Sequence, residues 1–153
     1  MKKINFLLIF LIPILISNCG YQPKFVKKKL NFNISEIQSS GEKSINSKII
    51  KNLNKFKNSN KAKQTIKVFI NTEKNITVVT KDEKGNDSKF LLNIISDVKI
   101  YENEKLIKEK TFIKDFTYKN IENKLDLSQY KKQIEQNLIN KIIEEISIFF
   151  NSL

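Results

Sequence analysis

The sequence has 153 residues, of which 40% are apolar, and its 28 basic and 16 acidic side chains give a formal net charge of +12. This length predicts one domain with a packed core, and three glycines with two prolines exclude a collagen-like or Pro/Gly-rich disordered chain. With no histidine and one cysteine, the sequence excludes His/Cys zinc sites, nucleophile–histidine pairs and an internal disulfide. We therefore expect no catalytic residues, no metal and no cofactor other than a covalent lipid.

Residues 1–18 have the organisation of a secretory signal peptide, which is removed on export. Lys2 and Lys3 precede an unbroken apolar run from Phe6 to Ile16. As a helix this run is only ~16 Å long, well short of a bilayer core of ~30 Å, so a transmembrane helix is not expected.

The apolar run ends in Ile16-Ser17-Asn18-Cys19-Gly20, which is similar to a bacterial lipobox, with Asn18 where a smaller residue is usual. The thiol of such a cysteine accepts a diacylglyceryl group, and its freed amine takes a third acyl chain, which together give stable anchoring. The alternative is that Cys19 is an incidental thiol or a small buried hydrophobe. We predict lipidation of Cys19, and Gly20 after it resembles sorting to the outer membrane, on its periplasmic side.

Residues 19–29 form the predicted lipidated tether, with four lysines that either meet anionic headgroups or belong to a solvated linker. From Cys19 onward the chain has 26 lysines and 16 acidic residues, so the exported chain still has a formal net charge of +10. Export disfavours nucleic acid as a partner. Lipid phosphates and lipopolysaccharide are the plausible polyanions.

Residues 30–153 form the predicted single domain, and its first half alternates between strand and helix patterns. Leu30, Phe32 and Ile34 alternate with polar residues, which predicts a strand. Helical spacing follows from Ile45 to Phe56, with Ser44 as the predicted cap. For residues 65–80 the pattern predicts either two short strands or one long bent strand.

The second half contains two further strands and a long helix. A turn is predicted at 81–89, then strands at 90–100 and at about 106–118, the last with Phe112, Phe116 and Tyr118 on one side. From Leu127 to Leu153 apolar residues recur every three or four positions, and Asp126 with Gln129 resembles a capping box. This apolar stripe is too wide for a coiled-coil seam, so the helix is expected to pack on the sheet.

The order strand, helix, three strands, helix predicts an α+β fold. Placing both helices on one face of a four-stranded, mainly antiparallel sheet buries both helical stripes and one face of each strand. The expected architecture is a two-layer α/β sandwich, β-α-β-β-β-α.

Three features together resemble the LPS-assembly lipoprotein, the LptE family. They are Cys19-Gly20-Tyr21-Gln22-Pro23 at the lipidated end, the order of elements, and Phe116-Thr117-Tyr118 before a long terminal helix. The resemblance covers essentially the whole exported chain. It implies a non-enzymatic outer-membrane lipoprotein that plugs the LptD β-barrel translocon, helps this barrel assemble, and binds lipopolysaccharide on its way to the cell surface.

The resemblance also places lipopolysaccharide contacts at the turn between the second and third strands and near the entry to the last helix. Lys81 and Lys84 match the first place, and Lys119 and Lys124 match the second. The alternative is that these four are ordinary solvated turn lysines. A different class of function also stays open, a structural or tethering envelope lipoprotein that serves as accessory subunit of another outer-membrane complex.

Overall fold

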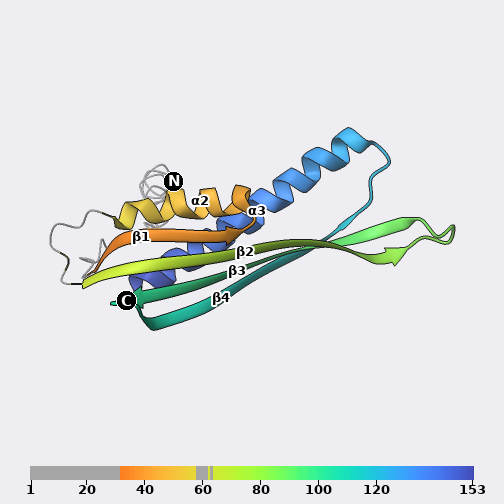
Figure 1. The fold of residues 1–153 in the computed structure, drawn as a ribbon. Coiled ribbons are helices and arrows are strands. Elements are labelled where there is room, and N and C mark those ends of the chain that lie inside the picture. The colour runs from red at the N-terminus through yellow and green to blue at the C-terminus, as the bar shows by residue number, and fades with distance from the viewer. Residues whose placement is uncertain (1–31, 58–61, 63) are drawn as a thin grey trace, which may run out of the picture.

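The computed structural model describes residues 32–57, 62 and 64–153, which fold into two layers (Figure 1). One layer is a four-stranded sheet, and the other consists of two helices that lie on the same face of the sheet. The elements in chain order are β1 (Phe32–Gly41), α2 (Lys43–Leu53), the 3-10 turn η1 (Asn54–Phe56), β2 (Gln64–Lys81), β3 (Asp87–Glu102), β4 (Lys105–Lys119) and α3 (Lys124–Asn151). The predicted α+β sandwich is confirmed.

The sheet has the spatial order β1-β2-β3-β4 and is mixed. β2, β3 and β4 form the predicted antiparallel meander, whereas β1 runs parallel to β2 because α2 carries the chain back between them. Residues 65–80 belong to one strand rather than two, with a register irregularity between Val78 and Lys81.

One face of the sheet is buried and the other is not. In β2 and β3 the buried apolar side chains all occupy even positions, from Ile66 to Ile100, and they meet the apolar faces of α2 and α3 in a single core. The odd positions face away from the helices and stay at least partly exposed. This alternation is the physical basis of the two-layer arrangement.

The length of β1 determines which part of β2 has two neighbours. β1 pairs with β2 only as far as Gly41, which stands opposite Thr72 with φ +83°. A β-carbon at Gly41 would collide with the Thr72 carbonyl oxygen, and the next amide, Glu42, donates to that same oxygen at 2.8 Å. The chain then turns into α2, so β2 continues beyond Thr72 with only β3 beside it.

Both predicted helix caps are wrong. α2 begins one residue before Ser44, and its N-cap residue Glu42 makes no side-chain cap; the Ser44 hydroxyl donates to the Glu42 carboxylate instead. α3 begins at Lys124, where the Asn123 side chain accepts from the amides of Leu125 and Asp126. Asp126 therefore lies inside the first turn, where a carboxylate still interacts favourably with the helix dipole.

Candidate functional site

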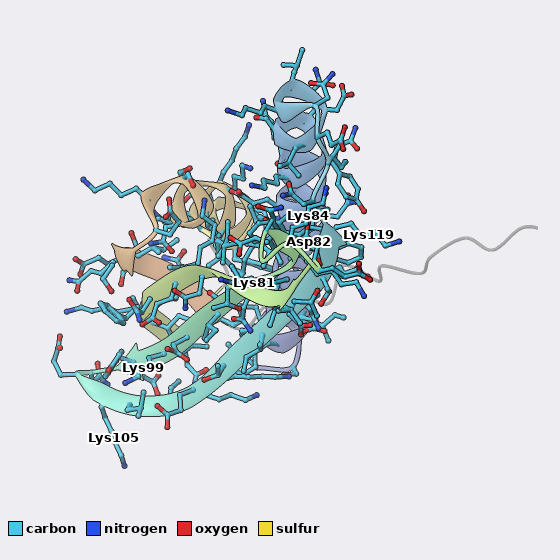
Figure 2. The ribbon with its side chains drawn as sticks, turned by 90° about the vertical axis from the view of Figure 1, so that its right-hand side faces the viewer. Lys81, Asp82, Lys84, Lys99, Lys105 and Lys119 are labelled. Atoms are coloured by element: carbon cyan, nitrogen blue, oxygen red, sulfur yellow. The ribbon has the colours of Figure 1, made fainter. Side chains whose placement is uncertain are left out.

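The four predicted lysines lie at one end of the molecule. Lys81 ends β2, Lys84 lies in the turn to β3, and Lys119 ends β4, so three of them surround the tip of the sheet (Figure 2). Lys124 is the first residue of α3, which begins at this same end (Figure 1). All four are exposed, and none takes part in the ion pairs found among the described residues.

Lys89 joins this group, and the sequence reading missed it. The β3–β4 register places Lys89 directly opposite Lys119, two exposed ammonium groups on neighbouring strands. Like charges in directly opposed positions of a sheet are destabilising, and a bound anion would relieve the repulsion. Only the strand register reveals this pair, because the two lysines are thirty positions apart in the sequence.

Acidic side chains stand among these lysines. The turn from Lys81 to Lys89 carries three lysines and also Asp82, Glu83 and Asp87. The Asp82 carboxylate accepts from the amides of Lys84 and Asn86 and from the Asn86 side chain, and the bonds from Asn86 lead in lowering the pKa of Asp82. The Asp82 carboxylate therefore stabilises the turn through these hydrogen bonds, and the lysine side chains point outward from it.

The connection from β4 to α3 is tied to the same turn. The Asn120 side chain donates to the Asp87 carbonyl and its backbone amide donates to the Ser88 carbonyl, both at 2.8 Å. An open hollow of about 500 Å³ lies between the turn and this connection, lined by Lys89, Lys119 and acidic and amide side chains. The site is therefore an open polar hollow in which Lys89 and Lys119 stand among the carboxylates of Asp82, Asp87 and Glu122, so any contact with an anion is confined to its lysine side.

An aromatic cluster lies beneath this end, between the sheet and α3. Tyr118 stacks on Phe90 with ring centroids 5.5 Å apart and meets Tyr130 of α3 edge to face at 6.4 Å. The Lys131 ammonium lies 5.3 Å from the Phe90 ring and 5.7 Å from the Tyr118 ring. Phe116 lies on the same face of β4, as predicted, yet it is 43% exposed.

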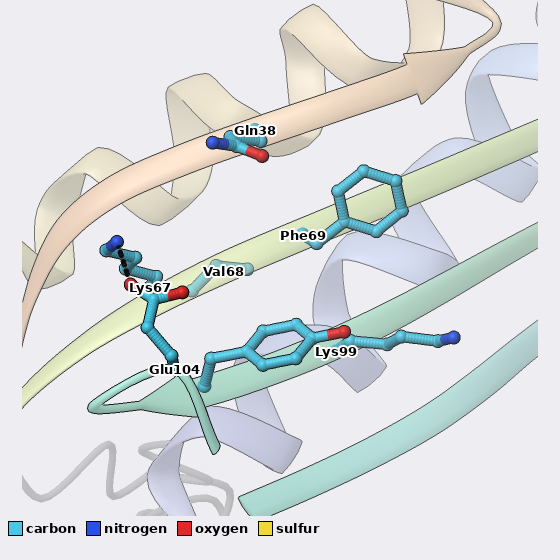
Figure 3. A pocket seen from close by; sticks show the side chains of 7 residues that line it. Gln38, Lys67, Val68, Phe69, Lys99 and Glu104 are labelled. Atoms are coloured by element: carbon cyan, nitrogen blue, oxygen red, sulfur yellow. Dashed lines mark hydrogen bonds and ion pairs between the residues drawn. The ribbon is translucent and has the colours of Figure 1, made fainter. Parts of the chain in front are cut away.

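A second hollow lies on the uncovered face of the sheet, toward the opposite end (Figure 3). It holds about 290 Å³ and is lined by Phe69 and Tyr101 with polar and charged side chains around them. Lys67 pairs there with Glu104, and the hydrogen bond that its ammonium donates to this carboxylate raises the pKa of Lys67. None of the predicted site residues lines this hollow.

The predicted signal peptide, tether and lipidated Cys19 lie outside the described residues. In the described part of the chain no helix is both long and apolar enough to cross a bilayer. The same residues contain no group of three or more acidic, cysteine or histidine side chains suited to a metal ion.

No family model matches the chain, and no curated protein matches it in sequence. Solved structures do match its fold. Rare lipoprotein B from Shewanella oneidensis is 14% identical with a TM-score of 0.62, over 78% of this chain and 95% of that one. A minor lipoprotein from Acinetobacter baumannii is 10% identical with a TM-score of 0.61, over 80% and 92%. Lipoprotein B from Nitrosomonas europaea, uncharacterized, is 11% identical with a TM-score of 0.54, over 76% and 81%. The chain therefore has the fold of these lipoproteins.

Proposed function

We propose that the protein is an outer-membrane lipoprotein of the LptE type, anchored through a lipid on Cys19 and without enzymatic activity. In this role it plugs an LptD-type β-barrel, helps that barrel assemble and binds lipopolysaccharide. The observation that carries the proposal is the fold shared with rare lipoprotein B over nearly the whole of that chain, since rare lipoprotein B is LptE. The Cys19-Gly20-Tyr21-Gln22-Pro23 start agrees with it.

The surface of the domain supports the plug role. The barrel lumen is polar, and the sheet face turned away from the helices mixes charged, amide and hydroxyl side chains with partly exposed apolar ones. The lysines of the domain bind phosphates as point charges, without the bidentate hydrogen bonding that arginine offers.

The lysine-bearing end is the proposed contact for lipopolysaccharide. Lys89 and Lys119 line the hollow, Lys81 and Lys84 lie on the adjoining β2–β3 turn, and Lys124 begins α3 without lining the hollow. The opposed pair Lys89 and Lys119 gives the sharpest reason to place a phosphate there, because the anion removes a repulsion that the free protein carries.

The partner is tested by purifying the tagged, lipidated protein from its native outer membrane and identifying what co-elutes in stoichiometric yield. Recovery of an LptD-type barrel supports the plug role. Repeated recovery of a different complex, or of none, contradicts it and favours a structural or tethering lipoprotein instead.

Lipopolysaccharide binding is tested with Lys119→Glu in the lipidated protein, measured by titration with purified lipopolysaccharide. Losing one favourable charge contact and adding a repulsive one weakens binding by about five- to tenfold, on the order of 1 kcal/mol per lysine. Lys105→Glu is the matched control, because Lys105 is an exposed lysine at the opposite end of the sheet (Figure 2). Equal loss in both variants means that the contact depends on net charge and not on this end.

A further inference from the structure

The two edges of the sheet differ in how they are protected. An exposed strand edge presents unpaired backbone groups, and proteins commonly guard it with charged side chains. β4 forms one edge and carries five lysines, at positions 105, 108, 110, 114 and 119. The other edge belongs to β2 once β1 has ended, and from Asn75 to Thr80 it has no charged residue.

The open part of the β2 edge is regular and unpaired. Pairing with β1 stops at Thr72, and the register stays regular until the irregularity that follows Val78. Within the described residues, no backbone hydrogen bond outside the β2–β3 ladder involves Glu73 to Val78. In a strand paired on one side, every second residue turns its N–H and C=O outward. This six-residue stretch, which we call the open edge, can therefore accept another strand.

The same residues also expose apolar side chains. Ile76 is 51% and Val78 is 45% exposed, and both lie on the helix-facing side, where α2 does not reach. β1 and α2 together cover β2 only as far as Thr72, so backbone pairing and apolar cover end at the same place. A lipid chain would cover the side chains but leave the backbone unpaired, whereas an added strand satisfies both.

On the helix side of the sheet the surroundings of the open edge are basic, whereas the exposed Glu73 occupies an odd position and faces away from the helices. Beside the open edge, α2 and α3 enclose a groove of about 500 Å³ lined by Lys48 and Lys132. The one carboxylate in this groove, Glu135, is 3.3 Å from Lys74 of the open edge and already paired with it. The positive charges of Lys48 and Lys132 are therefore not balanced within the groove. An incoming strand with an acidic side chain beside its apolar residues would complement them.

We propose that the open edge, Glu73 to Val78, is the docking site for an extended segment of the partner barrel, which adds to the sheet beside β2 beyond the end of β1. The segment is apolar where it faces Ile76 and Val78, and acidic toward α2 and α3. This inference rests on the proposed function, because the barrel supplies the strand. In this mode of docking the backbones of the two strands hydrogen-bond to each other, so the contact tolerates variation in side-chain sequence.

Hydrogen–deuterium exchange, measured by mass spectrometry on the lipidated protein alone and in its complex with the co-expressed LptD-type barrel, tests the inference. Strand addition slows the outward amides of the open edge by at least about tenfold in the complex. Complex formation without that slowing overturns the docking site and leaves the proposed function standing, whereas failure to form the complex contradicts the proposed function. Slowing that appears without the barrel and grows with protein concentration identifies a second copy as the occupant, which also overturns the inference.

A matched pair of substitutions gives an independent measurement. Val78→Lys places a guarding charge on the open edge and is expected to lower the yield of complex at least about fivefold, as edge lysines block strand pairing. Ile107→Lys is the control, since Ile107 is 44% exposed, nearly the same as Val78, but lies on β4 at the other end. Circular dichroism verifies that both variants fold, and equal yields of complex from the two overturn the proposal.

Discussion

Tyr118 illustrates how a single polar atom affects stability. Its ring is 2% exposed and packs between Phe90 and Tyr130, yet its hydroxyl has no hydrogen-bond partner among the described residues. Removing an unsatisfied buried group of this kind is neutral or stabilising. We expect Tyr118→Phe to raise the free energy of unfolding by up to about 1 kcal/mol in urea denaturation. A loss of more than that would mean that the hydroxyl has a partner.

The same hydroxyl predicts a pH dependence. Burial raises the pKa of Tyr118, so the folded protein keeps this proton at a pH where the unfolded chain has lost it. Stability therefore falls as pH rises through the ordinary tyrosine pKa of about 10 toward the raised folded value. The difference in unfolding free energy between Tyr118→Phe and the natural protein is expected to widen above about pH 10 and to stay constant below it.

Asn46 is the buried polar residue on which the junction of α2 with the sheet depends. Its side-chain amide donates to the Ser40 carbonyl at 2.6 Å, and its oxygen accepts from the Thr72 hydroxyl at 2.7 Å. Asn46→Ala removes the donor to the Ser40 carbonyl and leaves the Thr72 hydroxyl only its 3.3 Å contact with the Ser96 hydroxyl, and it is expected to cost about 2–3 kcal/mol of unfolding free energy. Ser47→Ala is the control on the exposed side of the same helix, and a comparable loss there would indicate a general effect on α2.

At the scale of elements, the ending of β1 is the feature that opens the β2 edge, and Gly41 enforces it. Gly41→Ala combines a left-handed backbone with a collision against the Thr72 carbonyl, so we expect a loss of at least about 3 kcal/mol. Gly85→Ala has nearly the same φ, +82°, and nothing near its β-carbon, so it carries the backbone strain alone, about 1 kcal/mol. Thermal unfolding of the two variants separates collision from strain, and equal shifts would contradict the close approach.

The elements were predictable from sequence because each buries one periodic stripe. Period-two alternation in β3 and the three-to-four spacing in α3 both matched the structure, since burial on one face imposes them. The N-cap residues were not predictable, because several polar residues precede each helix and tertiary packing decides which of them caps it. Asn123, for example, lies only three positions before the predicted Asp126.

The candidate site was predictable only in part, because its contacts depend on how the strands align. A turn rich in Asp, Gly and Asn pointed to the loop that carries Lys84, but the pairing of Lys89 with Lys119 depends on strand register. The open edge depends on where β1 ends, and the predicted strand and following loop did not fix that residue. Long-range partners such as Ser96 and Thr72 likewise become visible only once β2 and β3 are aligned.

At the scale of the whole molecule, cover by the helices is uneven along the sheet. All the described buried apolar residues form one core, which predicts cooperative unfolding. Yet no residue of β2 beyond Thr72 is buried, and the hairpin from Ile76 to Phe90 extends past α2 with α3 over only part of it (Figure 1). Local contact density decides which segments open first, so this hairpin end is expected to open below the global free energy.

Native-state hydrogen exchange of the isolated protein at low denaturant checks this expectation. Amides of the hairpin end, around Ile76 and Val78, should exchange through openings at least about 2 kcal/mol below those of Ile70 and Val98. The difference follows from burial, since the second pair is fully enclosed beneath the helices. Uniform exchange along β2 and β3 would mean that the sheet acts as one rigid unit. Protection of this hairpin end on complex formation is then expected, because an added strand supplies the backbone partners that the open edge lacks in the free protein.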